Sequence, residues 1–240
     1  MTTTLTKAMI FAAGRGERMR PLTDRTPKPL LEAGGKPLIV WQIERLAQAG
    51  IRTVVINHAW LGERIESALG DGSRWGVQLR YSAEQEALET AGGIAQALPL
   101  LEDGGASEIF LGIAGDVYTD FDYASLHAQA ARLAALPQPG MYLVMVPNPP
   151  FHPKGDFGLV DGVVSSDSQP RFTFGSIGLY DTRMFQDLPR GTRRALSPYY
   201  QDTAARGLAR GELYAGPWDN VGTPAQLQAL DERLRLKAAG

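Results

Sequence analysis

The chain has 240 residues, with 24 Lys and Arg against 26 Asp and Glu, and no cysteine. The length suits one α/β domain with a full core, and the near-zero net charge argues against a nucleic acid as the main partner. Without cysteine, disulfides, thiolate catalysis and cysteine-based metal sites are excluded, and the three histidines make a histidine-rich zinc site unexpected.

The first predicted element is a buried strand over residues 8–11, followed by a glycine-rich turn. The turn reads Ala12-Ala13-Gly14-Arg15-Gly16-Glu17-Arg18-Met19, and Pro21-Leu22-Thr23 and Pro27-Lys28-Pro29 follow it. Such a turn exposes several backbone N–H groups to one point, which suits phosphate oxygens. Because Arg18 and Lys28 add positive charge, the segment predicts a triphosphate site.

Two common phosphate motifs do not match this turn. The Walker pattern is absent, and the dinucleotide fingerprint fails because Met19 stands where its third glycine belongs. A lone Gly-x-Gly is most often an ordinary tight turn, so the prediction depends on the whole run.

Strands and helices alternate through the middle of the chain. Further strands are predicted at residues 53–57, 77–81, 108–114 and 142–146, and amphipathic helices at 37–49, 61–69, 90–101 and 123–136. This alternation predicts a mainly parallel sheet covered on both faces, with ligands beyond the carboxyl ends of the strands.

The last third has a different pattern. Short strands at 157–160, 162–165 and 172–180 predict a small antiparallel lobe or an excursion over the sheet. Thr223 and Pro224 predict the start of a final helix. No linker, repeat or long apolar run interrupts the chain, and residues 1–7 lack the layout of a signal segment. We therefore expect one cytoplasmic domain over 1–240, without a membrane partner or an acetyltransferase domain.

The run G-x-G-x-R-M-x-P-L-T with the later P-K-P resembles the sugar-phosphate nucleotidyltransferases, the nucleoside-diphosphate-sugar pyrophosphorylases. The resemblance implies a Rossmann-like three-layer αβα sandwich with a mixed, mainly parallel sheet. It also implies nucleotidyl transfer to a sugar 1-phosphate, with Arg18 and Lys28 as the catalytic cations. The implied nucleotide-binding residues of the turn are Ala12, Ala13, Gly14 and Gly16. A phosphate monoester is already a nucleophile, so no general base is required.

Gly115-Asp116 follows the predicted strand 108–114. By itself this aspartate also fits a turn or a helix cap, although less well than a ligand at the end of a central strand. In the family it binds the catalytic magnesium, and the second ligand precedes V-G-T-P, which is Asn220 here. We therefore expect Mg²⁺ on Asp116 and Asn220, two hard oxygen donors. Asp219 stays as the alternative second ligand if the backbone bulges.

Residues 81–93, YSAEQEALETAGG, resemble the family's base-reading loop, E-x-L-G-T-A-G, with Glu89 in place of its glycine. The implied nucleotide contacts are Glu84, Glu89 and Gly92. The segment also fits a plain helix start capped by Thr90.

Other runs resemble the branch of the family that transfers uridylyl groups from UTP to N-acetylmuramate 1-phosphate in bacterial cell-wall recycling. These runs are 56–62, 88–93, 115–117, 155–157 and 172–174. This branch implies sugar contacts from Gly155, Asp156 and Ser176, although Gly175-Ser176 inverts the expected order.

The sugar of this branch carries a lactyl carboxylate, which needs a cation or N–H donors once it leaves water. Arg171, Arg193 and Arg194 are the candidates. Two alternatives remain open: a hexose 1-phosphate guanylyl- or thymidylyltransferase, and a non-catalytic nucleotide-sugar binding module.

Overall fold

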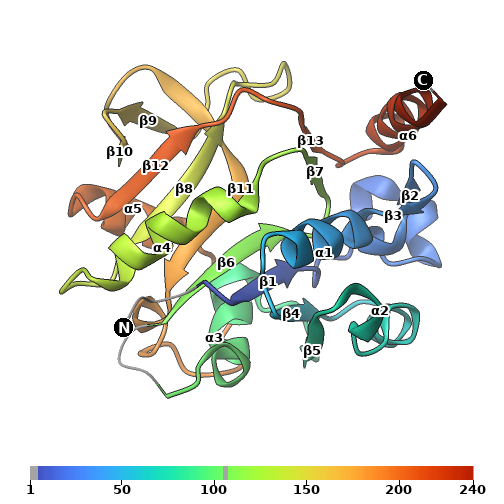
Figure 1. The fold of residues 1–240 in the computed structure, drawn as a ribbon, viewed down its shortest axis with the longest axis horizontal. Helices are drawn as coiled ribbons and strands as arrows, with labels where there is room; N and C mark the ends of the chain where they lie inside the picture. The colour runs from blue at the N-terminus through green and yellow to red at the C-terminus, as the bar shows by residue number, and fades with distance from the viewer. Residues whose placement is uncertain (1–4, 105–107, 240) are drawn as a thin grey trace.

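The computed structural model describes residues 5–104 and 108–239, so residues 1–4, part of the expectation about a signal segment, lie outside it. Its centre is a nine-stranded sheet in the order β5-β4-β1-β6-β11-β8-β12-β10-β9 (Figure 1). The strands are β1 Lys7–Phe11, β4 Thr53–His58, β5 Gln78–Ala83, β6 Ile109–Ala114, β8 Met141–Val146, β9 Phe157–Val160, β10 Val163–Ser165, β11 Arg171–Asp181 and β12 Ala209–Leu213.

One half of the sheet is parallel. β5, β4, β1 and β6 run in the same direction, and Ile10 of β1 lies between Ile56 of β4 and Ile113 of β6. All three side chains are fully buried, as expected for parallel strands covered on both faces. The turn after β1 and the Gly-Asp pair after β6 therefore lie at the same edge of the sheet.

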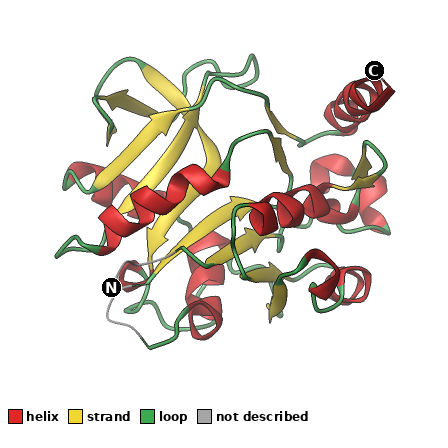
Figure 2. Cartoon of the chain, viewed as in Figure 1, coloured by secondary structure: helices red, strands yellow, loops and turns green. Residues whose placement is uncertain are grey.

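Helices cover both faces, which makes three layers (Figure 2). The helices are α1 Leu38–Gln48, α2 Gly62–Leu69, α3 Glu89–Leu101, α4 Leu126–Ala134, α5 Ser197–Ala205 and α6 Pro224–Ala239. Alternate residues of the strands face opposite layers: Ile10 packs with the core residues of α1 and α4, and Met9 with those of α3. The predicted αβα sandwich with a mixed sheet is confirmed.

The long strand β11 differs from the prediction for residues 172–180. It lies inside the sheet, antiparallel to both β6 and β8, and only β9 and β10 extend the sheet beyond β12. The expected strand is present, but it belongs to the main sheet, and its register against β8 shifts between Phe174 and Gly178. Ser176, in this irregular stretch, has a φ of +57°.

Small elements complete the region around the turn after β1. β2 (Glu32–Ala33) and β3 (Lys36–Pro37) form a hairpin, and β7 (Val117–Thr119) pairs with β13 (Trp218–Asn220). The last helix, α6, packs on the hairpin, where the Gly34 N–H donates to Asp231 Oδ1 at 2.8 Å. None of the helices within the described ranges is long and apolar enough to cross a membrane.

Candidate active site

The glycine-rich turn that follows β1 has free space around Gly14. A Cβ added at Gly14 would meet no heavy atom within 4 Å. At Gly16, whose φ is +70°, a Cβ would lie 3.0 Å from Thr23 and 3.1 Å from the Cβ of Lys28. Gly16 therefore permits both the left-handed backbone and the close approach of Lys28 to the turn.

Lys28 meets the aspartate predicted from the end of β6. Its Nζ forms an ion pair with Asp116 Oδ2, and the two side chains are 11% and 28% exposed. The backbone carbonyl of Asp116 accepts the N–H of Val221 at 3.0 Å, and Asn220 pairs with Val117, the residue after Asp116. The structure thus brings Lys28, Asp116 and Asn220 into one small region.

Arg18 approaches the same region from the turn after β1. A Cβ added at Gly222 would lie 3.1 Å from Arg18 Nη2, so the guanidinium packs against the Val-Gly-Thr-Pro segment. Within the described chain, the Arg18 guanidinium forms no ion pair or hydrogen bond. It is available to a ligand, as an arginine that binds leaving phosphates must be.

The Asp219 side chain is directed toward α6 and not toward Lys28 and Asp116. Its carboxylate pairs with the Arg233 guanidinium of α6, with Oδ1 3.1 Å from Nη1. Because β13 is extended, neighbouring side chains project to opposite sides, and this pairing favours Asn220 over Asp219 as a ligand.

The donor set fits a magnesium ion that is shared with substrate. The Asp116 carboxylate and the Asn220 amide supply hard oxygens, which Mg²⁺ prefers. Within residues 5–104 and 108–239, no group of three or more His, Cys, Asp or Glu could hold a metal. Substrate phosphates and water would therefore complete the coordination, as is usual for Mg²⁺.

Asn57, at the end of β4, lies in the run 56–62, but the sequence analysis gave it no role. Its Oδ1 accepts the Ala12 N–H at 3.0 Å, and its Nδ2 donates to Glu84 Oε1 at 2.7 Å. Glu84 Oε2 accepts the Leu88 N–H at 2.8 Å, and burial raises the pKa of Glu84. Hydrogen bonds through Asn57 and Glu84 thus connect the glycine-rich turn after β1 to the predicted base-reading loop. The available signal was a polar residue at the carboxyl end of a buried strand.

The start of α3 explains why Glu89 is unusual. Its φ is +59°, a left-handed conformation that favours glycine, the residue common at this position in the family pattern. The Glu89 carboxylate is 3.1 Å from Arg193 Nε. A Cβ added at Gly92 would lie 2.3 Å from the Thr192 carbonyl, so Gly92 permits the segment 189–196 to pack on α3.

A pocket of about 350 Å³ has Asn220, one of the two candidate metal ligands, in its lining. Its lining residues are Phe151, His152, Asp156, Phe157, Thr173, Phe174, Ser176, Ser197, Tyr200, Trp218 and Asn220. The predicted sugar residues Asp156 and Ser176 are among them. Gly155 is not: its φ is +63°, and a Cβ there would lie 2.9 Å from the Phe172 carbonyl, so it acts as a turn residue.

The three arginines proposed for the lactyl carboxylate are absent from this lining. Arg171 donates to the backbone carbonyls of Ser166 and Asp156. Arg193 pairs with Glu89, and Arg194 lines a different pocket beside Tyr199. Among the described residues that line the pocket beside Asn220, the one side chain able to carry positive charge is His152.

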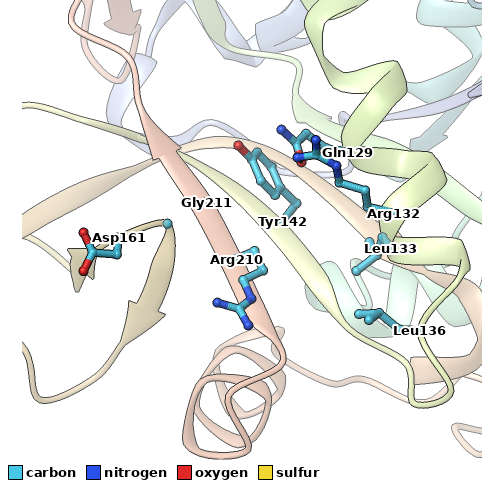
Figure 3. A pocket seen from close by; sticks show the side chains of 9 residues that line it. Gln129, Arg132, Leu133, Leu136, Tyr142, Asp161, Arg210 and Gly211 are labelled. Carbon is cyan, nitrogen blue, oxygen red and sulfur yellow. The ribbon is translucent and has the colours of Figure 1, made fainter.

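A second pocket of similar volume, about 350 Å³, lies between α4 and β12 (Figure 3). It contains none of the predicted site residues. Arg132 comes from α4 and Arg210 from β12, and their guanidinium groups do not converge on one point (Figure 3). Volume therefore does not distinguish the two pockets, whereas the nearby grouping of Lys28, Asp116 and Asn220 favours the first as the candidate site.

Comparisons with known proteins indicate the family to which the chain belongs. The profile of the family described as Nucleotidyl transferase matches residues 7–169. The chain is 48% identical over 229 residues to the N-acetylmuramate alpha-1-phosphate uridylyltransferase of Neisseria meningitidis, covering 92% of this chain and 95% of that protein. It is 33% identical to the Caulobacter vibrioides protein of the same name, covering 95% of this chain and 96% of that protein. The fold matches the inositol-1-phosphate CTP transferase of T. maritima with a TM-score of 0.74 at 17% identity, over 99% and 97% of the two chains.

Proposed function

The chain belongs to the nucleotidyl transferase family, and we propose that it transfers the uridylyl group of UTP to N-acetylmuramate 1-phosphate. The products are UDP-N-acetylmuramate and pyrophosphate, and the reaction serves peptidoglycan recycling in the bacterial cytoplasm. One domain, 1–240, performs it. The observation that supports this proposal most directly is the 48% identity to a uridylyltransferase across 95% of that enzyme's length.

The reaction needs orientation and charge rather than a base. An oxygen of the sugar 1-phosphate attacks the α-phosphorus of UTP, the new P–O bond forms, and the bond to the bridging oxygen breaks in line. Pyrophosphate leaves with the electron pair. The nucleophile is already an anion, so no proton needs to be removed from it.

Arg18 and Lys28 supply the positive charge in this proposal. The Arg18 guanidinium, beside Gly222, binds the β- and γ-phosphates that leave. Lys28, held against Gly16, contacts the α-phosphate and the incoming sugar phosphate, which offsets their mutual repulsion. Backbone N–H groups of Ala13 and Gly14, in the open part of the turn, add donors. The Ala12 N–H already donates to Asn57, so Ala12 shapes the turn.

Enzymes of this family generally use a divalent metal ion, and we propose Mg²⁺ on Asp116 and Asn220. These two residues would hold the ion, which would supply positive charge to the phosphates of the substrates. Before substrate arrives, Lys28 is the counter-ion of Asp116 and compensates the charge of this half-buried carboxylate.

The substrates are read at two further places. Glu89, at the start of α3, accepts a hydrogen bond from the base or the ribose, and Glu84 and Gly92 support its loop. Asp156 and Ser176 accept hydrogen bonds from sugar hydroxyls in the pocket beside Asn220.

Pyrophosphate release tests the proposal, with the four common nucleoside triphosphates each paired with a panel of sugar 1-phosphates. The expected result is the highest kcat/KM for UTP with N-acetylmuramate 1-phosphate. A preference for GTP or TTP with a hexose 1-phosphate would support the alternative transferases. Nucleotide-sugar binding without release of pyrophosphate from any pair would indicate a binding module.

A further inference from the structure

The sugar pocket contains one histidine with an ordered neighbour. His152 Nε2 lies 3.0 Å from Asp156 Oδ1, and Asp156 Oδ2 accepts the Phe174 N–H at 2.8 Å. An ionised carboxylate only accepts hydrogen bonds, so the imidazole donates its Nε2–H to Asp156. Asp156 is anchored to the sheet and therefore fixes the orientation of the ring.

The other ring nitrogen is available to a ligand. His152 Nδ1 has no hydrogen-bond partner within the part of the chain that the structure describes. The His152 side chain is 40% exposed and lines the pocket. A second proton, on Nδ1, makes the ring a cation. One N–H then donates to Asp156, and the other is available to donate to a ligand.

The residue before His152 is apolar and open to solvent. Phe151 lines the same pocket and is 59% exposed, the highest value among the large apolar residues that line it. An exposed aromatic ring at a pocket commonly covers an apolar part of a ligand. The loop 147–156 thus brings an apolar ring and an ionisable ring, on consecutive residues, to the same pocket. A lactyl ether has a matching pair of groups, a methyl and a carboxylate.

We propose that His152 selects sugar 1-phosphates that carry a carboxylate, by donating Nδ1–H to the lactyl group of N-acetylmuramate 1-phosphate. This inference rests on the proposed function, because it places that sugar in this pocket. His152 replaces Arg171, Arg193 and Arg194 as the partner of the carboxylate. An acceptor without such a group, N-acetylglucosamine 1-phosphate, gains nothing from the imidazole.

The loop does not depend on His152 for its position. Asn148 Nδ2 donates to the Arg171 carbonyl at 3.0 Å, and Asn148 Oδ1 accepts the Thr173 hydroxyl at 2.9 Å. Asp156 is held separately by the Phe174 N–H. A His152 variant should therefore fold with the loop in place, so that a change in kinetics reports the lost ligand contact.

The experiment compares wild type, His152→Gln and His152→Arg. For each protein we would measure KM and kcat with N-acetylmuramate 1-phosphate, KM for UTP, and the inhibition constant of N-acetylglucosamine 1-phosphate as a competitor. We expect His152→Gln to raise KM for the muramyl substrate about 10- to 100-fold, the usual effect of losing a hydrogen bond to a charged group. The competitor's constant and KM for UTP should change by less than about threefold. His152→Arg, which keeps a cation, should recover part of the affinity.

Lys154→Gln is the matched control, because it removes an exposed positive charge from the same loop outside the pocket lining. Equal weakening of the muramyl substrate and the competitor in His152→Gln would overturn the inference, as would no change in either. The same loss in Lys154→Gln would also overturn it, since general electrostatics would then suffice. A wild type that forms no UDP-N-acetylmuramate would remove the proposed function and this inference together, whereas an active wild type with an unaffected His152→Gln removes the inference alone.

Discussion

Lys28 and Asp116 form an ion pair although 88 residues separate them in the chain. Lys28 lies between the phosphate turn and β2, and Asp116 follows β6. The pair exists because β1 and β6 are parallel neighbours, so that the segments after them meet. Each partner holds the other in place before the triphosphate arrives.

Lys28→Gln should lower kcat about 10²- to 10³-fold, because one charge-stabilising donor is lost from the transition state. KM for UTP should change much less. Steady-state kinetics at saturating substrates measure this. Lys36→Gln is the matched control: Lys36 also forms an ion pair, with Glu44, but packs over Trp41 on the hairpin side. A Lys28→Gln enzyme with normal kcat and only a lower melting temperature would assign Lys28 a structural role.

Asn220→Ala should abolish most of the response of activity to Mg²⁺, whereas Asn220→Asp should stay active because it keeps an oxygen ligand. Asp219→Ala should retain turnover and lose about 0–1 kcal/mol of stability, since its pair with Arg233 is partly exposed. Activity titrated against Mg²⁺ separates the three variants. A crippled Asp219→Ala beside a normal Asn220→Ala would reverse the assignment of the second ligand.

Arg15 lies over Trp60, with its guanidinium 4.5 Å from the ring centroid. The Trp60 ring is fixed by its N–H, which donates to the Thr23 carbonyl at 3.0 Å. We expect this stack to position Arg15 beside the phosphates. Trp60→Leu should raise KM for UTP about two- to fivefold, the value of one exposed cation–π contact.

Arg74 over Trp75, at 3.8 Å, is a similar stack outside the site and gives the control. Arg74→Gln should leave KM for UTP unchanged. An unchanged KM in Trp60→Leu as well would show that the first stack has no role in binding.

Asn57→Asp should destabilise the protein at neutral pH. It keeps the acceptor for the Ala12 N–H, loses the hydrogen bond to Glu84 and places two carboxyl groups together. Burial already raises the pKa of Glu84, and the Asn57 hydrogen bond, which lowers it, would be lost. A carboxyl with a raised pKa in the folded state stabilises that state at low pH, and this stability is lost as pH rises through that pKa.

Thermal melting across pH checks this prediction. The loss of stability in Asn57→Asp, relative to wild type, should be larger at pH 8 than at pH 5. Asn57→Ala, which leaves buried groups unpaired without adding charge, should lose about 1–3 kcal/mol with a much weaker dependence on pH. Parallel pH profiles for the two variants would contradict the like-charge explanation.

The sequence predicted the parallel half of the sheet well, because buried strands such as residues 8–11 and 53–57 are continuous apolar runs. β12 was not predicted, because its sequence, ARGEL, contains no apolar run. β7 and β13 have three residues each, which is too short for a periodic signal. At the site, the P-K-P run indicated Lys28, and the Gly-Asp pair after a predicted strand indicated Asp116. The run 56–62 includes Asn57 but does not reveal its role, and no run includes His152. Their roles depend on partners 45 and 4 residues away that only folding identifies.

Glu89→Gly decides whether Glu89 reads the nucleotide or only begins a helix. A left-handed backbone costs a non-glycine residue about 1–2 kcal/mol, so glycine relieves strain at a φ of +59°. Glycine also gains freedom in the unfolded chain, worth about 0.5–1 kcal/mol, and the variant loses an exposed pair with Arg193. These effects nearly cancel, so the melting temperature should change little.

If the Glu89 carboxylate accepts a hydrogen bond from uridine, KM for UTP should rise about tenfold in Glu89→Gly. Arg193→Gln, which keeps the carboxylate and removes its partner, should leave KM nearly unchanged. An unaltered KM in Glu89→Gly would mean that the base is read elsewhere and that Glu89 tolerates its strained backbone without a role in binding.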